Sequence, residues 1–199
     1  HLAEGGVDVA LLEAEKLGWG ASGRNGGQLH SGQRRDQDWL EAHLGKEDAR
    51  ALWRMAEEAK ALVMELIARH GIRCDWRPGL IETVHKQRLV GEEQDYVLKL
   101  RRDYHHDAVE WLDREALAAR IGTDVYFGGR RDATAGHLDP LKLAQGIARA
   151  AAKAGARLHE GTRVTRISGT AATGFEIVTD TGGSSPLGSA SLFSDLAAG

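Results

Sequence analysis

The spacing of apolar side chains along the chain predicts several helices. Between residues 48 and 70, apolar side chains recur at the spacing of one face of an amphipathic helix. Asp139-Pro140 supplies an N-capping residue and a first-turn proline, so we expect a helix from there to Ala154. The same kind of pattern predicts a helix over about 88–104 and a short helix that Asp113 caps and that ends before Gly122.

Short apolar runs predict strands between these helices. Residues 1–4 have the pattern of the last turn of a helix, which Gly5-Gly6 would end. The run Val9–Leu12 then closes on Glu13 and is typical of a strand buried on both faces of a parallel sheet. Helix end, tight turn and buried strand together indicate the second half of a βαβ unit. Further strands are expected at 72–85, as one or two strands around a Pro78-Gly79 turn, and at 157–160, 163–168 and 174–180.

Composition and charge exclude several classes of partner. The 199 residues carry a formal net charge of -3 without a basic cluster, so we expect no nucleic-acid binding. No apolar stretch is long enough to span a bilayer, so no membrane partner is expected. The single cysteine, Cys74, allows no internal disulfide and favours a reducing, cytoplasmic setting. No metal site is expected, because the adjacent His105 and His106 would point in different directions.

Two features of the first 33 residues could carry chemistry. Glu13 ends the predicted buried strand, where dinucleotide-binding units place an acid that hydrogen-bonds ribose hydroxyls. Glycines in the loop 18–33 let the backbone approach a ligand, and Ser22 and Asn25 add hydrogen-bonding side chains. Arg24 could neutralise a phosphate charge. Alone, Glu13 is as consistent with a solubilising strand end and the loop with a flexible surface loop, but their pairing is more specific.

These motifs resemble the D-amino-acid-oxidase-like family of FAD-dependent oxidoreductases. The resemblance starts with Asp8–Glu15 and the loop from Gly18 to Leu29. It continues through Gly136–Pro140 and Gly155–Ile167 and covers about residues 1–181. The sequence Gly-Ala-Ser-Gly-Arg-Asn-Gly-Gly-Gln is most similar to the bacterial gamma-glutamylputrescine oxidoreductase branch.

The resemblance implies roles for nine residues. Glu13 matches the ribose-binding acid, Ala14 the residue beside the adenine, and Val164 the residue whose backbone meets the adenine edge. Ser22 matches a pyrophosphate contact. The residues that match the segment along the flavin are Asn25, Gly26, Gly27, Gln28 and Leu29. Arg24 and Asn25 stand in the loop where some relatives attach flavin through a histidine, so non-covalent FAD is expected.

The resemblance also implies the fold class and the domains. We expect an α/β fold, with a partial Rossmann-like FAD-binding domain over 1–33 and 136–181. An inserted α+β substrate domain, also partial, would occupy 34–135. The family's initial Gly-x-Gly-x-x-Gly turn and the segments beyond Val178 have no match here, so the chain is expected to be truncated at both ends. Residues 182–199 carry one charge and predict a non-native or disordered tail, with a poorly formed helix over 190–198 as the alternative.

The implied activity is oxidation of an amine by hydride transfer to flavin, with a gamma-glutamylputrescine-like or amino-acid-like substrate. No catalytic residue is identified within the chain. The expected partners are a small-molecule amine and either missing polypeptide segments or further copies of the chain. One alternative is a non-catalytic fragment that cannot hold FAD alone, because the phosphate-binding turn has no counterpart here. Another is an NAD-dependent dehydrogenase, since Glu13 would suit that ribose too, although the Ser22–Leu29 loop argues against it.

Overall fold

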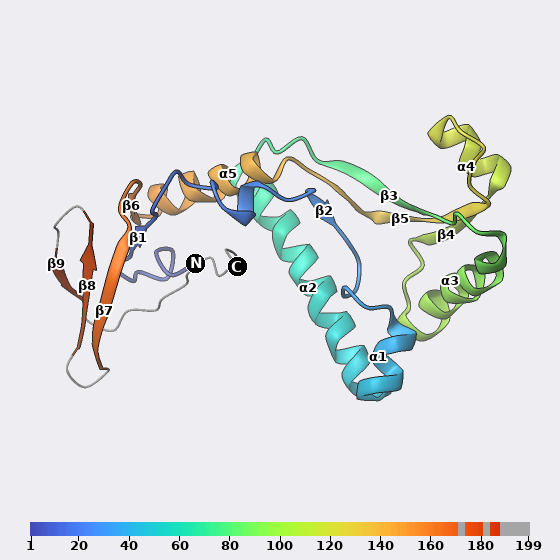
Figure 1. Ribbon diagram of the computed structural model, residues 1–199, viewed down its shortest axis with the longest axis horizontal. Helices are drawn as coiled ribbons and strands as arrows, with labels where there is room; N and C mark the ends of the chain where they lie inside the picture. Colours follow the sequence, from blue (N-terminus) through green and yellow to red (C-terminus); the bar gives the residue numbers. More distant parts are fainter. Residues whose placement is uncertain (171–173, 181–183, 188–199) are drawn as a thin grey trace. The chain divides into compact units, whose positions relative to one another are not determined.

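The computed structural model describes residues 1–170, 174–180 and 184–187, which are drawn in colour in Figure 1. The chain divides into two units. Unit 1 comprises His1–Asn25, Leu66–Cys74 and the described residues from Asp139 onward. Unit 2 comprises Gly26–Glu65 and Asp75–Leu138. Each unit is a mixture of helices and strands, so the expected α/β class is confirmed.

Unit 1 combines a small parallel sheet, an antiparallel sheet and one long helix. Strands β1 (Ala10–Leu12) and β6 (Arg157–His159) pair in parallel, with Leu11 opposite Leu158. The 3-10 turn η1 (Ala21–Gly23) packs against helix α5 (Pro140–Lys153). Strands β7 (Val164–Thr170), β8 (Gly174–Thr179) and β9 (Ser184–Leu187) form the antiparallel sheet.

The first residues of unit 1 confirm the predicted helix end. The Val7 amide donates to the Leu2 carbonyl at 3.0 Å, and the Gly6 amide donates to the Ala3 carbonyl at 3.0 Å. Gly6 has φ +81°. This pair of bonds around a residue with positive φ is the Schellman motif, which satisfies the last carbonyls of a helix.

Two predictions about unit 1 are wrong. The strand after this turn is not buried on both faces: Leu11 is 42% exposed and Ala10 is exposed. Within the described residues β1 pairs with β6 alone, so too little structure covers its faces. The predicted tail includes β9, whose backbone pairs with β8, so residues 184–187 are ordered strand. The rest of that tail, including the alternative helix over 190–198, lies outside the described residues.

Unit 2 is built around the long strand β5 (Gly128–His137). Strand β3 (Arg77–Thr83) pairs along one side of β5. On its other side lie β4 (Val109–Asp113) and, near its end, the two-residue β2 (Gln28–Leu29). All three pairings are antiparallel. The helical elements are α1 (Gln37–Leu44), α2 (Lys46–His70) as far as Glu65, η2 (Gln87–Leu89), α3 (Val90–Tyr104) and α4 (Arg114–Ile121).

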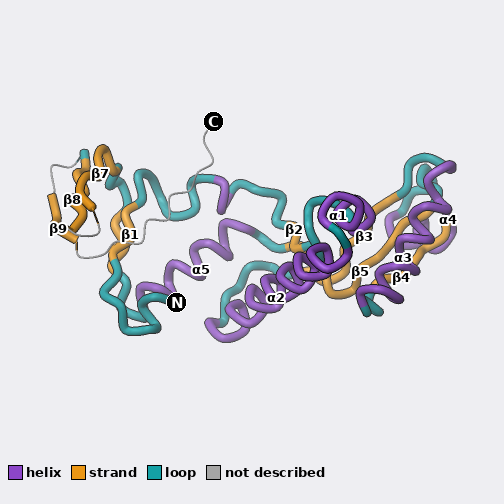
Figure 2. The backbone as a smooth tube through the Cα atoms, turned by 90° about the horizontal axis from the view of Figure 1, so that it is seen from below, coloured by secondary structure: helices purple, strands orange, loops and turns teal. Residues whose placement is uncertain are grey.

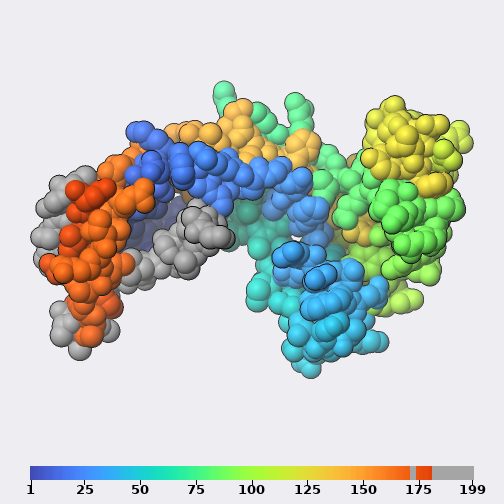
Figure 3. All heavy atoms as spheres, in the orientation of Figure 1, coloured from blue at the N-terminus to red at the C-terminus, as the bar shows by residue number. Residues whose placement is uncertain are grey.

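The core of unit 2 lies between α2, α3 and β4. Trp53 of α2 packs with Val97, Leu100 and Tyr104 of α3 and with Val109 of β4. The Trp53 and Tyr104 rings are 5.2 Å apart and tilted, a favourable aromatic arrangement. In Figure 2, α3 and α4 lie beside β4 at one end of this unit, and Figure 3 shows their atoms, green and yellow, filling that end. These packed side chains attach helices α2 and α3 to the sheet at β4.

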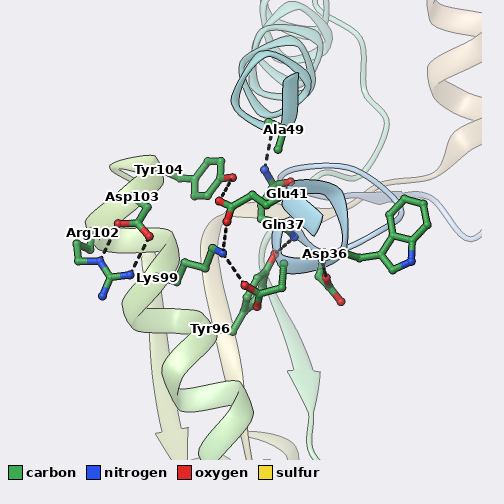
Figure 4. Close-up of polar contacts among 11 residues, drawn as sticks. Asp36, Gln37, Glu41, Ala49, Tyr96, Lys99, Arg102, Asp103 and Tyr104 are labelled. Atoms are coloured by element: carbon green, nitrogen blue, oxygen red, sulfur yellow. Dashed lines mark hydrogen bonds and ion pairs between the residues drawn. The ribbon is translucent and has the colours of Figure 1, made fainter. Parts of the chain in front are cut away.

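A polar cluster joins α1 to α3 (Figure 4). The Lys99 ammonium donates to Asp38 at 2.5 Å and to Glu41 at 2.7 Å, and the Tyr104 hydroxyl donates to Glu41 at 2.7 Å. Burial acts to raise the pKa of Glu41, but the hydrogen bonds from Lys99 and Tyr104 outweigh it and lower that pKa. The short helix α1 is thus fixed by charge pairing as well as by the buried Leu40.

Most of the predicted helices and strands are confirmed, with three differences in unit 2. Residues 72–85 contain one strand, β3, which is one of the two expected alternatives, but Pro78-Gly79 forms a bulge against β5 and not the expected turn. Strands β4 and β5 and helix α1 were not expected. The unit boundaries also differ from the predicted domain boundaries, since residues 26–33 belong to unit 2 and 66–74 to unit 1. The division into flavin and substrate domains therefore stays a prediction.

Candidate functional site

Glu13 lies where the two parallel strands of unit 1 end. Its amide donates to the His159 carbonyl at 2.8 Å, and its carbonyl accepts from the Thr162 amide at 2.8 Å. One carboxylate oxygen accepts from the Glu15 amide at 2.8 Å, and the side chain is half-buried. The carboxyl ends of parallel strands are where open α/β sheets bind ligands. The position of Glu13 therefore fits the ribose-binding role expected of it.

Ion pairs hold the segment after Glu13 against the turn before β7. Glu160 accepts from the Lys16 ammonium at 2.9 Å and from the Leu17 amide at 2.8 Å, and these bonds lower the pKa of Glu160. Arg163 donates to Glu15 at 2.9 Å. Val164, the next residue, begins β7 opposite Thr179. These bonds bring the segments that carry Glu13, Ala14 and Val164 together in unit 1. Their role at an adenosine stays a prediction.

The loop that follows folds onto the start of α5. Gly18 has φ +81°, and a Cβ there would lie 2.9 Å from the Leu141 side chain, so only glycine suits both the conformation and the contact. The Asn25 amide donates to the Ala21 carbonyl at 3.0 Å and to the Ser22 carbonyl at 3.3 Å. Asn25 therefore closes the η1 turn that carries Ser22.

Arg24 has a partner that the sequence did not reveal. Its guanidinium lies over the Trp19 ring, 4.2 Å from the centroid, and Trp19 is 51% exposed. A cation over an indole face is attracted by the ring quadrupole. The role of Arg24 in neutralising a phosphate charge stays a prediction. In this structure the Arg24 guanidinium contacts the Trp19 ring.

The remaining predicted site residues, Gly26–Leu29, belong to unit 2. Gly27 is buried with φ +69°, and its carbonyl accepts from the Leu138 amide at 2.9 Å. Gln28 and Leu29 form β2, opposite His137 and Gly136 of β5. The segment expected to line the flavin is thus an edge strand of the unit 2 sheet.

Unit 2 also contains a buried charged cluster that sequence reasoning missed. The Lys60 ammonium, 8% exposed, donates to Ser31 at 2.5 Å and to Thr134 at 3.0 Å and pairs with Glu57 at 2.8 Å. Its partners lie on three separate stretches of the chain. Only the Lys60–Glu57 pair, three residues apart on α2, is local; the contacts with Ser31 and Thr134 depend on the fold.

A second buried pair lies beside the first. The His106 ring and the Asp132 carboxylate are 2.7 Å apart. Burial acts to raise the pKa of Asp132, but hydrogen bonds from His106, Ser31 and Thr134 outweigh it and hold that pKa well below its usual range. A cavity of about 40 Å³ adjoins the pair, lined in part by His30, Glu82, Tyr96 and Arg130. It has room for water but not for an organic substrate.

The described residues contain neither a membrane-spanning helix nor a group of metal-ligating side chains. Within the described residues no helix is long and apolar enough to cross a bilayer. No group of three or more His, Cys, Asp and Glu side chains gathers as metal ligands would in that part of the chain. His106 is instead paired with Asp132, and His105 caps α3 in the left-handed conformation with φ 54°.

The chain matches a family model and is similar to two curated oxidoreductases. Residues 1–190 match the family model of the FAD-dependent oxidoreductases called DAO. The chain is 41% identical over 167 residues to a probable oxidoreductase OrdL of Rhizobium meliloti, covering 84% of this chain and 39% of the relative. It is 41% identical over 172 residues to the gamma-glutamylputrescine oxidoreductase of Escherichia coli, covering 85% of this chain and 40% of the relative.

Solved structures agree with the sequence relatives. The glycine oxidase of Geobacillus kaustophilus matches with a TM-score of 0.69 and 25% identity, over 93% of this chain and 48% of that one. The L-proline dehydrogenase of P. horikoshii matches with a TM-score of 0.68 and 16% identity, over 91% of this chain and 45% of that one, which supports the fold alone. The chain spans about two-fifths of the length of the curated relatives it matches. Because the family model matches nearly the whole chain, the chain belongs to the DAO family of FAD-dependent oxidoreductases.

Proposed function

We propose that this chain provides part of the flavin site and part of the substrate domain of an FAD-dependent amine oxidoreductase. The substrate we propose is a gamma-glutamylputrescine-like or amino-acid-like amine, as the names of the E. coli and Geobacillus relatives suggest. The observation that carries the proposal is the place of Glu13, at the carboxyl end of parallel strand β1 and directly before a glycine-rich loop folded on α5. We place the protein in the cytoplasm, with no nucleic acid, membrane or metal as a partner.

The residues present fit FAD in chemical type. Glu13 would accept hydrogen bonds from the ribose hydroxyls, because only one contact, the Glu15 amide, occupies its carboxylate within the described residues. The backbone of Val164 and the neighbouring Ala14 would meet the adenine. Ser22 would donate to the pyrophosphate, and the segment from Asn25 to Leu29 would lie along the flavin without a covalent link.

The bound cofactor would supply the redox chemistry, by accepting a hydride from the carbon next to the substrate nitrogen. The chain's own side chains would bind and orient. Glu13 and the loop on α5 would fix the adenosine half, while β2 would present Gln28 and Leu29 from the edge of the unit 2 sheet. We assign no catalytic residue within the 199 residues.

Two alternatives to this function differ in their support. The NAD-dependent dehydrogenase is overturned, because the family to which the chain belongs uses FAD. The other alternative is that these 199 residues alone do not retain FAD. It is supported by the sequence, in which no Gly-x-Gly-x-x-Gly turn stands before strand β1 to supply backbone amides to the pyrophosphate.

A titration of the purified chain with FAD tests the proposal. Quenching of flavin fluorescence measures weak binding, and gel filtration followed by a visible spectrum shows whether flavin is retained. We expect Glu13→Gln to weaken FAD binding about tenfold, because a charged acceptor of two hydroxyls is lost. Glu58→Gln changes an exposed glutamate of α2 and should leave the affinity unchanged.

The FAD titration can have three results, and each has a different meaning for the proposal. Retained flavin that bleaches when gamma-glutamylputrescine or an amino acid is added without oxygen would support the whole proposal. Weak binding that depends on Glu13 but is lost on the column would support the site and the fragment alternative together. An affinity that Glu13→Gln and Glu58→Gln leave equally unchanged would rule out the assigned ribose contact.

A further inference from the structure

The loop that follows Glu13 holds an exposed cation over an exposed indole ring (the Trp19–Arg24 pair). The carbon at the centre of the Arg24 guanidinium lies 4.2 Å from the centroid of the Trp19 ring. Trp19 is 51% exposed, and Arg24 is exposed as well. The two residues stand on either side of η1, the turn that carries Ser22 and packs against α5 (Figure 1).

The backbone of the loop places these two side chains beside each other. The Arg24 amide donates to the Ala21 carbonyl at 3.2 Å and so closes the η1 turn. Gly23 lies against Gly18 so closely that a Cβ on Gly23 would clash with the Gly18 carbonyl. Trp19 and Arg24 are the residues that follow these two glycines. The close approach of the glycines therefore brings the indole and the guanidinium together.

Arg24 keeps both its charge and its hydrogen-bond donors. Within the described residues its side chain has no carboxylate partner and donates no hydrogen bond. Other arginines of unit 1 differ, since Arg157 pairs with Asp8 and Arg163 pairs with Glu15. A carboxylate neutralises an arginine, whereas an indole attracts it through the ring quadrupole and adds no charge. The five N–H groups of the Arg24 guanidinium thus stay available to an anion.

We propose that Trp19 is a positioning residue that holds the Arg24 guanidinium ready for the pyrophosphate of FAD. The inference rests on the proposed function, in which Ser22 of η1 donates to the same pyrophosphate. Arg24 ends the turn in which Ser22 stands, so both side chains would serve one diphosphate. A guanidinium fork matches two phosphate oxygens through parallel N–H bonds.

The advantage of the indole is order before the ligand arrives. A long side chain loses rotamer freedom when it binds, and this loss opposes association. Arg24 is already held over Trp19, so part of the loss occurs when the loop folds. Trp19 would act on the ligand through Arg24 alone.

ADP and adenosine together isolate the diphosphate contribution, and no flavin is needed. We would titrate the labelled 199-residue chain with each ligand at constant ionic strength and follow the amide NMR signals of Glu13 and Arg24. Arg24→Gln should weaken ADP binding about tenfold, because a charge-assisted contact is lost. Trp19→Leu should weaken it about threefold, the size of an exposed cation–π contact. Both variants should bind adenosine as the unmodified chain does, whereas Glu13→Gln should weaken both ligands.

A double variant separates positioning from general support of the loop. With Arg24→Gln already present, Trp19→Leu should cause no further loss of ADP affinity, because Trp19 acts only through Arg24. Trp19→Phe keeps an aromatic face and should recover part of the affinity that Trp19→Leu loses. The matched control is Trp39→Leu on α1. Trp39 is 39% exposed and also lies near an arginine, Arg35, 5.2 Å from its ring centroid, so this change should affect neither ligand.

Several results would overturn the inference. Additive losses in the double variant, or an equal loss of ADP and adenosine affinity in Trp19→Leu, would show that Trp19 supports the loop and not Arg24. Unchanged ADP affinity in Arg24→Gln would remove the phosphate contact. Equal losses in Trp19→Leu and Trp39→Leu would show an effect without relation to the site.

The proposed function can fail separately. Adenosine binding that depends on Glu13, without tighter binding of ADP, would overturn the role of the Trp19–Arg24 pair and leave the proposed ribose contact in place. ADP binding that depends on Arg24 and Trp19 but not on Glu13 would support the pair and remove that ribose contact. A folded chain that binds neither ligand would overturn both.

Discussion

At the scale of single residues, the buried polar groups of unit 2 act in the stability of the fold and are not among the residues proposed to hold FAD. Among the described residues, Lys60 and His106 are buried, and the Asp132 side chain that pairs with His106 is 14% exposed. Buried ion pairs stabilise little in total, but removing one partner leaves the other uncompensated. These groups therefore fix the position of the segment around Ser31 relative to β5.

Asp132 should make the stability of unit 2 sensitive to acid. Its hydrogen bonds lower its pKa in the folded state, below the value of about 3.9 expected in the unfolded chain. A lowered pKa contributes stability above the unfolded value that is lost as the pH falls toward the folded value. We expect Asp132→Asn to reduce the free energy of unfolding by about 3 kcal/mol near neutral pH. That deficit should shrink as the pH falls below about 4.

Urea unfolding at a series of pH values measures this difference. Asp95→Asn, at an exposed position on α3, should match the unmodified chain at every pH. A deficit in Asp132→Asn that stays constant down to strongly acidic pH would show that the carboxylate charge is not what stabilises the pair.

At the scale of elements, helix α5 begins at the clearest capping signal of the sequence, Asp139-Pro140, and packs against the η1 turn of the candidate site. Asp139 accepts from the Lys142 amide at 3.0 Å, and this bond lowers the pKa of Asp139. Asp139→Ala should destabilise the helix by about 1 kcal/mol, whereas Asp139→Ser should keep most of the cap. Thermal unfolding measures both. Because the loop with Gly18 packs on Leu141, Asp139→Ala should also weaken FAD binding; an unchanged affinity would show that the loop holds its shape without the cap.

The elements that could be predicted are those whose signals are local. Asp113 and Asp139 both cap helices as expected, since a capping residue acts on amides three positions away. Strand β5 could not be predicted, because its residues 130–132 are Arg-Arg-Asp. Those charges are satisfied only by distant partners, such as Glu93 for Arg130 and Glu110 for Arg131. The candidate site divides in the same way: Glu13 was visible from a strand end, while the pairing of Gln28 with His137 depends on register.

At the scale of the whole molecule, the two units differ in how much apolar surface they bury. Among the described residues, most of the buried apolar side chains belong to unit 2, including Trp53, Leu100 and Leu117. Unit 1 has only Ile72, Cys74 and Ile177 in that class within the same residues. Composition alone did not show this asymmetry, because both units have apolar runs; what differs is how completely neighbouring elements cover them.

Unit 1 should therefore open at a lower free energy than unit 2, since local stability follows buried apolar contact. Hydrogen exchange should be fast at the amides of β1, whose Leu11 is 42% exposed, and slow along the β3–β5 ladder. Bound FAD should slow exchange around Glu13, because a ligand that binds only the closed form stabilises it. In Glu13→Gln the same FAD concentration should protect less. Equal exchange in β1 and β3 without FAD would mean that the exposed strand is stabilised by something other than apolar burial. FAD protection that spares the Glu13 segment would place the cofactor elsewhere in the chain.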